Sequence, residues 1–287
     1  MGDEMSEQRL SLDQLQRIRT KLNRLNNGSR IRDDAGACRF INERGFVLLM
    51  PIDGIPLPSL SEADEAEAWL GFAITDRAWA WKETLPQQKL CAYTKLIHGR
   101  GTFIDWRLYP SFLKVYGPDG DPEYEYENGR LDRTERDLYR IVATDGPIDS
   151  RELWVRAKSI FDGKRQRFTA ALERLQTRFY LTVAGGSLEG WTLHIWDLVE
   201  RQAPPETLVN LPSAAAARAN ILQQTIRNCH AIPERKLRSI LRWPQMELQE
   251  SIRTMKNNGL IAEVEVGGEA SSWLMFNERL VNEICYL

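Results

Sequence analysis

The hydrophobic positions in the second half of the chain follow one pattern twice. The first copy begins with apolar residues at helical spacing, at Phe168, Leu172 and Leu175. A short apolar run follows, then Gly185-Gly186, and then a second apolar run that contains Trp191. An amphipathic helix that leads into two strands with glycines between them is typical of a winged helix.

The second copy has the same parts in the same order. Its helical stripe consists of Leu248, Ile252 and Met255. Its two apolar runs flank Gly267-Gly268, and Trp273 takes the position that Trp191 takes in the first copy. Two such units predict a mainly helical α+β fold with tandem winged-helix repeats, and such repeats favour a nucleic acid as the partner.

The first half of the chain is predicted to contain several helices and one buried run. Helical patterns cover residues 11–25, 34–44, 59–70 and 87–97. The run 46–50 is apolar throughout and should be buried. The next eight residues, 51–58, include three prolines and a glycine, so we expect a stiff loop there.

Turn residues divide the chain into three predicted domains. Residues 118–130 are acidic and contain prolines and glycines, which predicts a linker. Residues 1–117 before it should form a helical, winged-helix-like domain that carries the proline-rich loop and an aromatic segment. The two repeats then occupy residues 131–202 and 203–287.

Composition narrows the classes of function. The net charge is −2, but residues 131–260 hold 20 Lys and Arg against 15 Asp and Glu, so the repeats are the basic part of the protein. Four scattered cysteines and three isolated histidines have no metal-site spacing. No apolar run is long enough to cross a bilayer. We expect a cytoplasmic protein with no metal, no cofactor and no membrane association.

Basic residues of the first repeat are the main candidates for DNA contact. Lys164, Arg165 and Arg167 lie at the predicted start of its third helix, where free backbone amides also attract phosphate. Arg156 and Arg174 complete this predicted set. The alternative is that these residues only form the solvated face of a surface helix.

The second repeat has its basic residues on its second helix instead. They are Arg235, Lys236, Arg238 and Arg242. Its third helix carries Glu247 and Glu250, which would repel phosphates. We therefore expect the second repeat to serve packing more than binding.

One carboxylate is a candidate for chemistry. Asp53 lies in the proline-rich loop, between Ile52 and Gly54, and a stiff loop can hold a reactive side chain at the edge of a binding surface. The alternative is that Asp53 only accepts hydrogen bonds from nearby backbone amides in an Asx-turn.

Two segments resemble a known family. Residues 45–55 read Gly-Phe-Val-Leu-Leu-Met-Pro-Ile-Asp-Gly-Ile, and residues 79–86 read Trp-Ala-Trp-Lys-Glu-Thr-Leu-Pro. Together with the repeats, they resemble the AlkZ/YcaQ-type DNA glycosylases, and more closely the AlkZ-related proteins. The resemblance extends in order over most of the chain. It implies tandem winged helices around a DNA-binding concavity and hydrolysis of the N-glycosidic bond of alkylated or crosslinked purines.

The resemblance also assigns roles to residues. The family's catalytic signature is Gln-apolar-Gln or Gln-apolar-Asp directly after a buried apolar run, and it aligns here with Pro51-Ile52-Asp53. Asp53 is therefore the catalytic candidate, while Pro51 has no side chain that could orient a water. Trp79, Trp81 and Lys82 are expected to contact DNA, and Lys82 stands where the family usually has His.

These observations lead to three hypotheses for the function. The first is a DNA-repair protein that binds double-stranded DNA, with weak or absent base excision. The second is a non-enzymatic regulator that binds DNA, and the third is a scaffold for protein contacts. The sequence specifies neither the lesion nor the oligomeric state.

Overall fold

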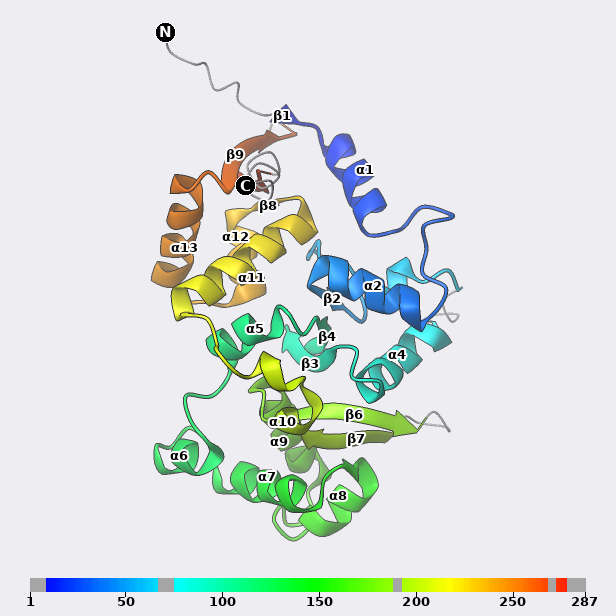
Figure 1. The fold of residues 1–287 in the computed structure, drawn as a ribbon, viewed down its shortest axis with the longest axis vertical. Coiled ribbons are helices and arrows are strands. Elements are labelled where there is room, and N and C mark those ends of the chain that lie inside the picture. The colour runs from blue at the N-terminus through cyan, green and yellow to red at the C-terminus, as the bar shows by residue number, and fades with distance from the viewer. Residues whose placement is uncertain (1–8, 67–74, 188–192, 268–271, 278–287) are drawn as a thin grey trace.

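Three small sheets, each with its own helices, follow one another along the molecule. The computed structural model describes residues 9–66, 75–187, 193–267 and 272–277. Figure 1 shows the sheet of β2, β3 and β4 at mid-length, the hairpin of β6 and β7 below it, and β8 and β9 above it. The mainly helical α+β class that the sequence predicts is confirmed.

The central unit is the N-terminal one. Its elements are α2 (Asp34–Arg44), β2 (Phe46–Leu48), α3 (Leu60–Ala63), α4 (Asp76–Gln87), β3 (Ala92–Ile97) and β4 (Arg100–Ile104). The sheet has the order β2-β4-β3. Helix α2 begins where Asp33 accepts a hydrogen bond from the Gly36 amide, and it ends at Gly45, whose positive φ of 66° favours glycine.

The second and third units repeat this plan. The second contains α7 (Arg133–Asp145), β5 (Ile148–Asp149), α8 (Ser150–Ala157), α9 (Arg165–Thr177), β6 (Leu181–Ser187) and β7 (Leu193–Leu198). The third contains α11 (Ala214–Cys229), β8 (Ala231–Pro233), α12 (Glu234–Leu241), α13 (Gln245–Asn257), β9 (Ile261–Val266) and β10 (Trp273–Phe276). Their sheets have the orders β5-β7-β6 and β8-β10-β9. In all three units, the strand that comes last in the sequence is therefore the central strand of the sheet.

The remaining elements connect or extend the units. They are β1 (Arg9–Leu10), α1 (Leu12–Leu22), α5 (Tyr109–Tyr116), α6 (Pro122–Glu127), α10 (Val199–Gln202) and a 3-10 turn at Pro205–Thr207. Strand β1 pairs in parallel with β9 and extends the third sheet. Among the described helices, none is long and apolar enough to span a membrane.

The central unit shares a hydrophobic core with each neighbour. One core joins Phe40 and Trp81 to Phe168 of the second unit, and the other joins Phe46 to Ile221 of the third. The Asn228 side chain also donates to the Arg44 and Phe46 carbonyls, both at 3.0 Å, which fixes α11 to the start of β2. The loop after β2 is therefore held by the core on both sides.

The structure corrects two sequence predictions of secondary structure. Residues 92–97, predicted as part of a helix, form strand β3, because β4 pairs with them and the local pattern does not reveal that partner. The predicted linker 118–130 contains α6, whose Glu125 is buried and ion-paired with Arg178. The domain boundaries themselves stay a prediction.

The glycines at 185–186 are also placed differently from the prediction. They lie in β6, opposite Ile195 and His194, and the connection that follows is outside the described residues, as is Trp191. A Cβ on Gly186 would lie 2.3 Å from Glu83 Cγ, so glycine allows α4 to approach the strand closely. This glycine therefore serves packing between two units.

Candidate nucleic-acid interface

The loop that carries Asp53 is a tight turn directly after β2. Ile52 and Ile55 face each other in an isolated antiparallel bridge, and the Ile55 amide donates to the Ile52 carbonyl at 2.9 Å. Gly54 has a positive φ of 72°, which the turn requires. Asp53 is exposed, and no amide of the described chain donates to its carboxylate. The Asx-turn alternative is therefore not seen, and the carboxylate is available to a ligand.

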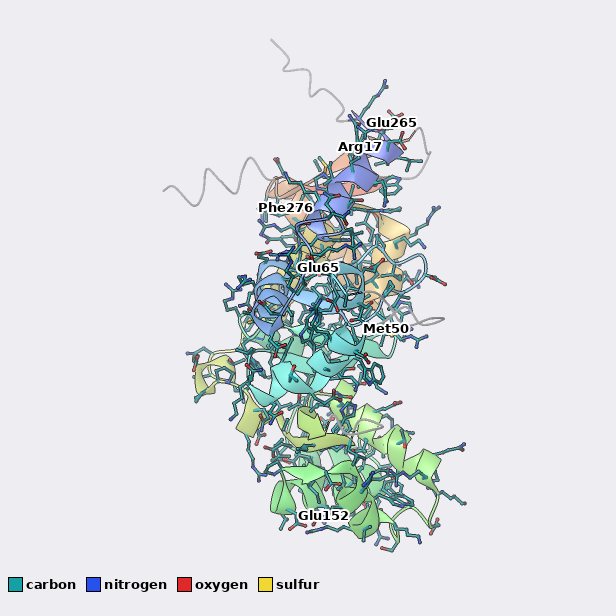
Figure 2. The ribbon with its side chains drawn as sticks, turned by 90° about the vertical axis from the view of Figure 1, so that its right-hand side faces the viewer. Arg17, Met50, Glu65, Glu152, Glu265 and Phe276 are labelled. Carbon is teal, nitrogen blue, oxygen red and sulfur yellow. The ribbon has the colours of Figure 1, made fainter. Side chains whose placement is uncertain are left out.

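This loop lies midway along the molecule. Figure 2 shows Met50, which precedes the loop, between Glu152 of the second unit and Phe276 of the third along the long axis. The loop contacts the third unit, because a Cβ on Gly54 would lie 3.2 Å from Lys236 Nζ. The catalytic candidate and the basic helix of the third unit are thus brought together.

A cavity of about 430 Å³ opens between the loop and the third unit. Its lining residues are Arg19, Gly54, Ile55, Pro56, Pro233, Arg235, Lys236 and Trp273. Every charged side chain in this lining is a cation. We refer to it as the cationic cavity.

Helix α12 presents a cationic face beside this cavity. The basic residues on it and at its C-terminal cap are Arg235, Lys236, Arg238 and Arg242. They are exposed or half-buried, and within the described ranges none forms an ion pair. Leu237, Ile240 and Leu241 pack into the core instead. These four cations therefore do not pack in the core, and the expectation that the second repeat serves packing more than binding stays a prediction.

The arginines predicted in the second unit are mostly neutralised by neighbours. Arg156 pairs with Asp145 and Glu152, while Arg167 lies 3.3 Å from Asp162. An arginine that is already paired attracts a phosphate less strongly, because binding must break or share its ion pair.

Arg174 is neutralised in the same way, whereas Lys164 and Arg165 are not. Arg174 pairs with Glu135 on α7. Lys164 is exposed at the N-terminal cap of α9 and forms no ion pair with the described residues, and Arg165 stacks over Trp154 at 5.0 Å. Only these two predicted cations of the second unit are without a carboxylate partner in the described chain.

The aromatic segment on α4 divides into exposed and buried side chains. Trp79 is 36% exposed, whereas Trp81 is completely buried and its indole N–H donates to Asp34 at 2.9 Å. Lys82 is only 3% exposed, and its ammonium lies 3.9 Å from the centre of the Trp79 ring. The prediction that Trp81 and Lys82 contact DNA does not fit this burial and needs correction.

Lys82 instead belongs to a buried ionic cluster between two units. Its Nζ donates to Glu83 Oε1 at 2.6 Å, and Nδ1 of His194 on β7 lies 3.1 Å from the same oxygen without the alignment of a hydrogen bond. Burial lowers the pKa of the Lys82 ammonium, and Glu83 opposes this shift. The sequence alone does not reveal this cluster, since His194 is far from Lys82 and Glu83 along the chain.

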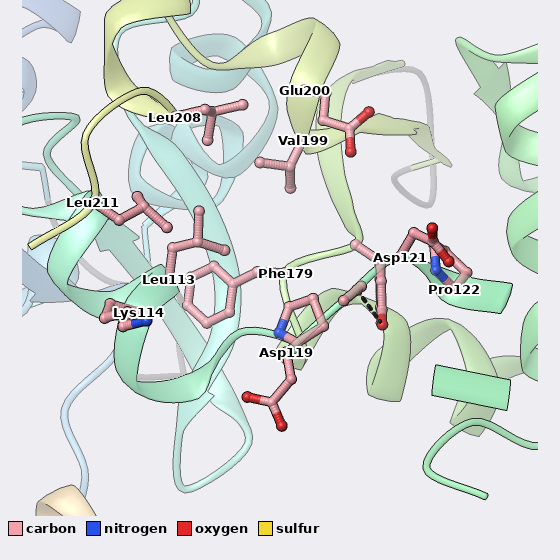
Figure 3. A pocket seen from close by; sticks show the side chains of 13 residues that line it. Leu113, Lys114, Asp119, Asp121, Pro122, Phe179, Val199, Glu200, Leu208 and Leu211 are labelled. Carbon is pink, nitrogen blue, oxygen red and sulfur yellow. Dashed lines mark hydrogen bonds between the residues drawn. The ribbon is translucent and has the colours of Figure 1, made fainter. Parts of the chain in front are cut away.

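A second cavity is mainly acidic, with Lys114 beside three carboxylates in its lining. It measures about 460 Å³ and lies between α5, α6 and the segment around Leu208. Figure 3 shows Asp119, Asp121 and Glu200 around an apolar floor that includes Leu113 and Phe179. These carboxylates would repel a phosphate, so this cavity is no candidate for nucleic acid. No group of three or more potential ligands for a metal ion occurs in the described residues.

Comparisons with known proteins define the family. The model of the AlkZ-related family matches residues 31–242, so the chain belongs to this family, as its two motifs indicate. Among solved structures, it is similar to Streptomyces sahachiroi DNA glycosylase AlkZ, with a TM-score of 0.62 and 14% sequence identity. The match covers 96% of this chain and 72% of that chain, and at this identity it shows the fold alone. A comparison with curated proteins gave no match.

The buried cluster generates a prediction about stability. Glu83→Gln should lower the free energy of unfolding by about 3–5 kcal/mol, because it leaves the buried Lys82 ammonium without its counter-charge. The matched control is Glu263→Gln, which removes the exposed pair with Lys256 and should cost less than about 1 kcal/mol. Urea denaturation of both variants checks this, and equal costs would mean that the cluster does not stabilise the protein.

Proposed function

We propose that this protein binds double-stranded DNA and takes part in DNA repair, with its three units acting as tandem winged helices. The observation that carries the proposal is the cationic face of α12 beside the exposed Asp53 loop. Membership of the AlkZ-related family supports it, and the similar fold belongs to a DNA glycosylase. The shared order of helices and strands in the three units supports the winged-helix assignment.

The distribution of unpaired cations supports DNA contact through the third unit. Phosphate contacts provide most of the affinity in DNA binding, and each contact releases counter-ions. Arg238 and Arg242 have no carboxylate partner among the described residues, whereas Arg156 and Arg167 do. In a winged helix, the second helix lies near the backbone, so α12 would fix the position of the DNA rather than read its bases.

The second unit would add a smaller contact. Of the second unit's residues predicted to contact DNA, Lys164 and Arg165 at the start of α9 are the two without a carboxylate partner in the described chain. The third helix of the central unit, α4, packs against β6. The face of α4 that meets β6 is therefore not available to enter a groove of DNA. DNA would therefore lie across the third unit and the loop, with the second unit as a minor contact.

Base excision would depend on Asp53 alone. A glycosylase has to stabilise an oxocarbenium-like sugar and deliver a water, and a carboxylate can do both. Pro51 has no hydrogen-bonding side chain with which to hold that water. We therefore propose weak or absent excision with DNA binding retained, which favours a repair protein that binds damage over an efficient glycosylase.

Removing the unpaired cations should weaken DNA binding in a salt-dependent way. We expect Arg238→Gln/Arg242→Gln to reduce the slope of log affinity against log salt by about 0.9 for each lost phosphate contact. Fluorescence anisotropy with a labelled duplex, measured over a range of salt concentrations, gives this slope.

The matched control changes two arginines that are paired. Arg156→Gln/Arg167→Gln removes the same number of charges and should change the slope less. Both variants should keep their thermal midpoint, since exposed charges contribute little to stability. If the control weakens binding as much as the α12 variant, the DNA surface is not on the third unit. If neither variant changes binding, the protein does not bind DNA by these residues.

Substitution of Asp53 tests the catalytic role. On alkylated duplex DNA, we expect few abasic sites from the natural protein. If the natural protein does excise bases, Asp53→Asn should reduce this excision by about a hundredfold or more, the usual scale for loss of an acid–base group. Duplex affinity should stay the same or rise slightly, because Asp53 is an exposed anion near a cationic face. Strong excision that survives the substitution would place the catalytic group elsewhere.

A further inference from the structure

We propose that the cationic cavity is a binding site for a nucleoside monophosphate group, with the phosphate held by Arg19, Arg235 and Lys236 and the base against Trp273. This inference rests on the proposed function, because DNA is one source of such a group. It goes further by assigning a pocket and the chemical class of its ligand.

Arg19 is the most informative residue of the cavity. Its Nε donates to the Cys229 carbonyl at 3.0 Å and its Nη2 to the Ala231 carbonyl at 2.7 Å, which fixes the guanidinium at the end of α11. Burial lowers the pKa of this guanidinium, and no carboxylate of the described chain pairs with it. A partly desolvated cation without a counter-ion is costly, and a bound anion would offset that cost.

Two other partly buried arginines of this protein have carboxylate partners, whereas Arg30, like Arg19, donates to backbone carbonyls. Arg77 pairs with the buried Asp64, and Arg178 pairs with the buried Glu125. The cationic cavity differs because Arg235 and Lys236 join Arg19 there and its lining contains no carboxylate. Guanidinium groups bind phosphate with a planar pair of donors, and an ammonium adds a point charge, so phosphate suits this set.

The rest of the lining is apolar and includes a large aromatic ring. Trp273 is 7% exposed, and its indole N–H has no hydrogen-bond partner in the described structure. A buried indole N–H usually has a partner, and this one has none among the described residues. Trp273 is paired with Pro233 across the sheet, and both residues line the cavity. Flat apolar surfaces of this kind are suited to a base.

The volume of the cationic cavity suits one nucleotide and is too small for a duplex. The cavity of about 430 Å³ is in the range of small-molecule pockets, roughly 300–1,000 Å³. Gly54 forms one wall, and Asp53 is the residue before it. A nucleotide in the cavity would therefore lie next to the catalytic candidate. Its source would be a nucleotide unstacked from DNA or a free mononucleotide.

Titration of the full-length protein with small ligands tests the pocket. We expect deoxyadenosine monophosphate to bind, and deoxyadenosine and inorganic phosphate each to bind about tenfold more weakly or worse, because each lacks half of the contacts. Isothermal calorimetry gives the affinities. If inorganic phosphate binds as tightly as the nucleotide, or if no ligand binds, the nucleotide assignment is overturned.

Substitutions in the lining test whether the nucleotide binds in the cationic cavity. Arg235→Gln/Lys236→Gln should weaken nucleotide binding about tenfold or more. Arg253→Gln removes an exposed cation of α13 outside the cavity, so it should leave nucleotide binding unchanged. Trp273→Phe, which keeps an aromatic ring, should remove the nucleotide-induced change in tryptophan fluorescence. Equal effects of the two cation variants would overturn the site.

Competition with DNA distinguishes the two sources. A duplex with a mismatched base, which unstacks readily, should displace the mononucleotide if DNA provides the ligand. If the duplex binds without displacing it, the pocket serves a free nucleotide. Absence of duplex binding by the natural protein with nucleotide binding intact would overturn the proposed function and not this pocket. Absence of nucleotide binding with duplex binding intact would overturn only this pocket.

Discussion

The packing of α4 against β6 is the contact on which the arrangement of the central unit and the second unit depends. It requires Gly186, because any Cβ there would overlap the side chain of Glu83. The same contact buries Glu83 completely. The cost of burying this carboxylate is offset by the Lys82 ammonium and by the His194 ring, which both lie beside it. One consequence concerns the proposed function: the inner face of the third helix of the central unit is used for packing, so the proposed contact with DNA is assigned to other elements.

Charge is distributed between the units in a way that fits this constraint. The second unit's Arg156, Arg167 and Arg174 are paired with its own carboxylates, which stabilise local structure but weaken the attraction for phosphate. Helix α12 of the third unit keeps its cations unpaired within the described chain, next to the loop of Asp53. Carboxylates outnumber Lys114 in the acidic cavity, so of these two cavities the cationic cavity is the one suited to a phosphate.

The sequence predicted those features that local signals determine. Helix α2 has the predicted bounds, because Asp33 caps its first turn and Gly45 ends it. Strand β3 was predicted wrongly, since its strand character comes from pairing with β4. The double glycine was interpreted as a turn, because a glycine that allows close packing looks the same in a sequence.

The candidate site was predicted less completely than the fold. The Asp53 loop followed from its prolines and from the family resemblance, and its exposure agrees with a role in binding. The basic residues were harder to rank, because an ion pair such as Arg174 with Glu135 joins residues 39 positions apart. Trp81 and Lys82 looked like surface residues of an aromatic segment, but the fold buries both. Which cations remain unpaired depends on tertiary structure, which a single sequence does not reveal.

The central claim is that DNA lies on the third unit beside the Asp53 loop. Lysine acetylation footprinting, with and without a duplex, tests it directly because each side chain reports its own protection. Lys236 should become much less reactive when DNA is bound, while Lys114 at the acidic cavity should stay as reactive as before. Protection of Lys164 with Lys236 still fully reactive would contradict the account and place the DNA on the second unit.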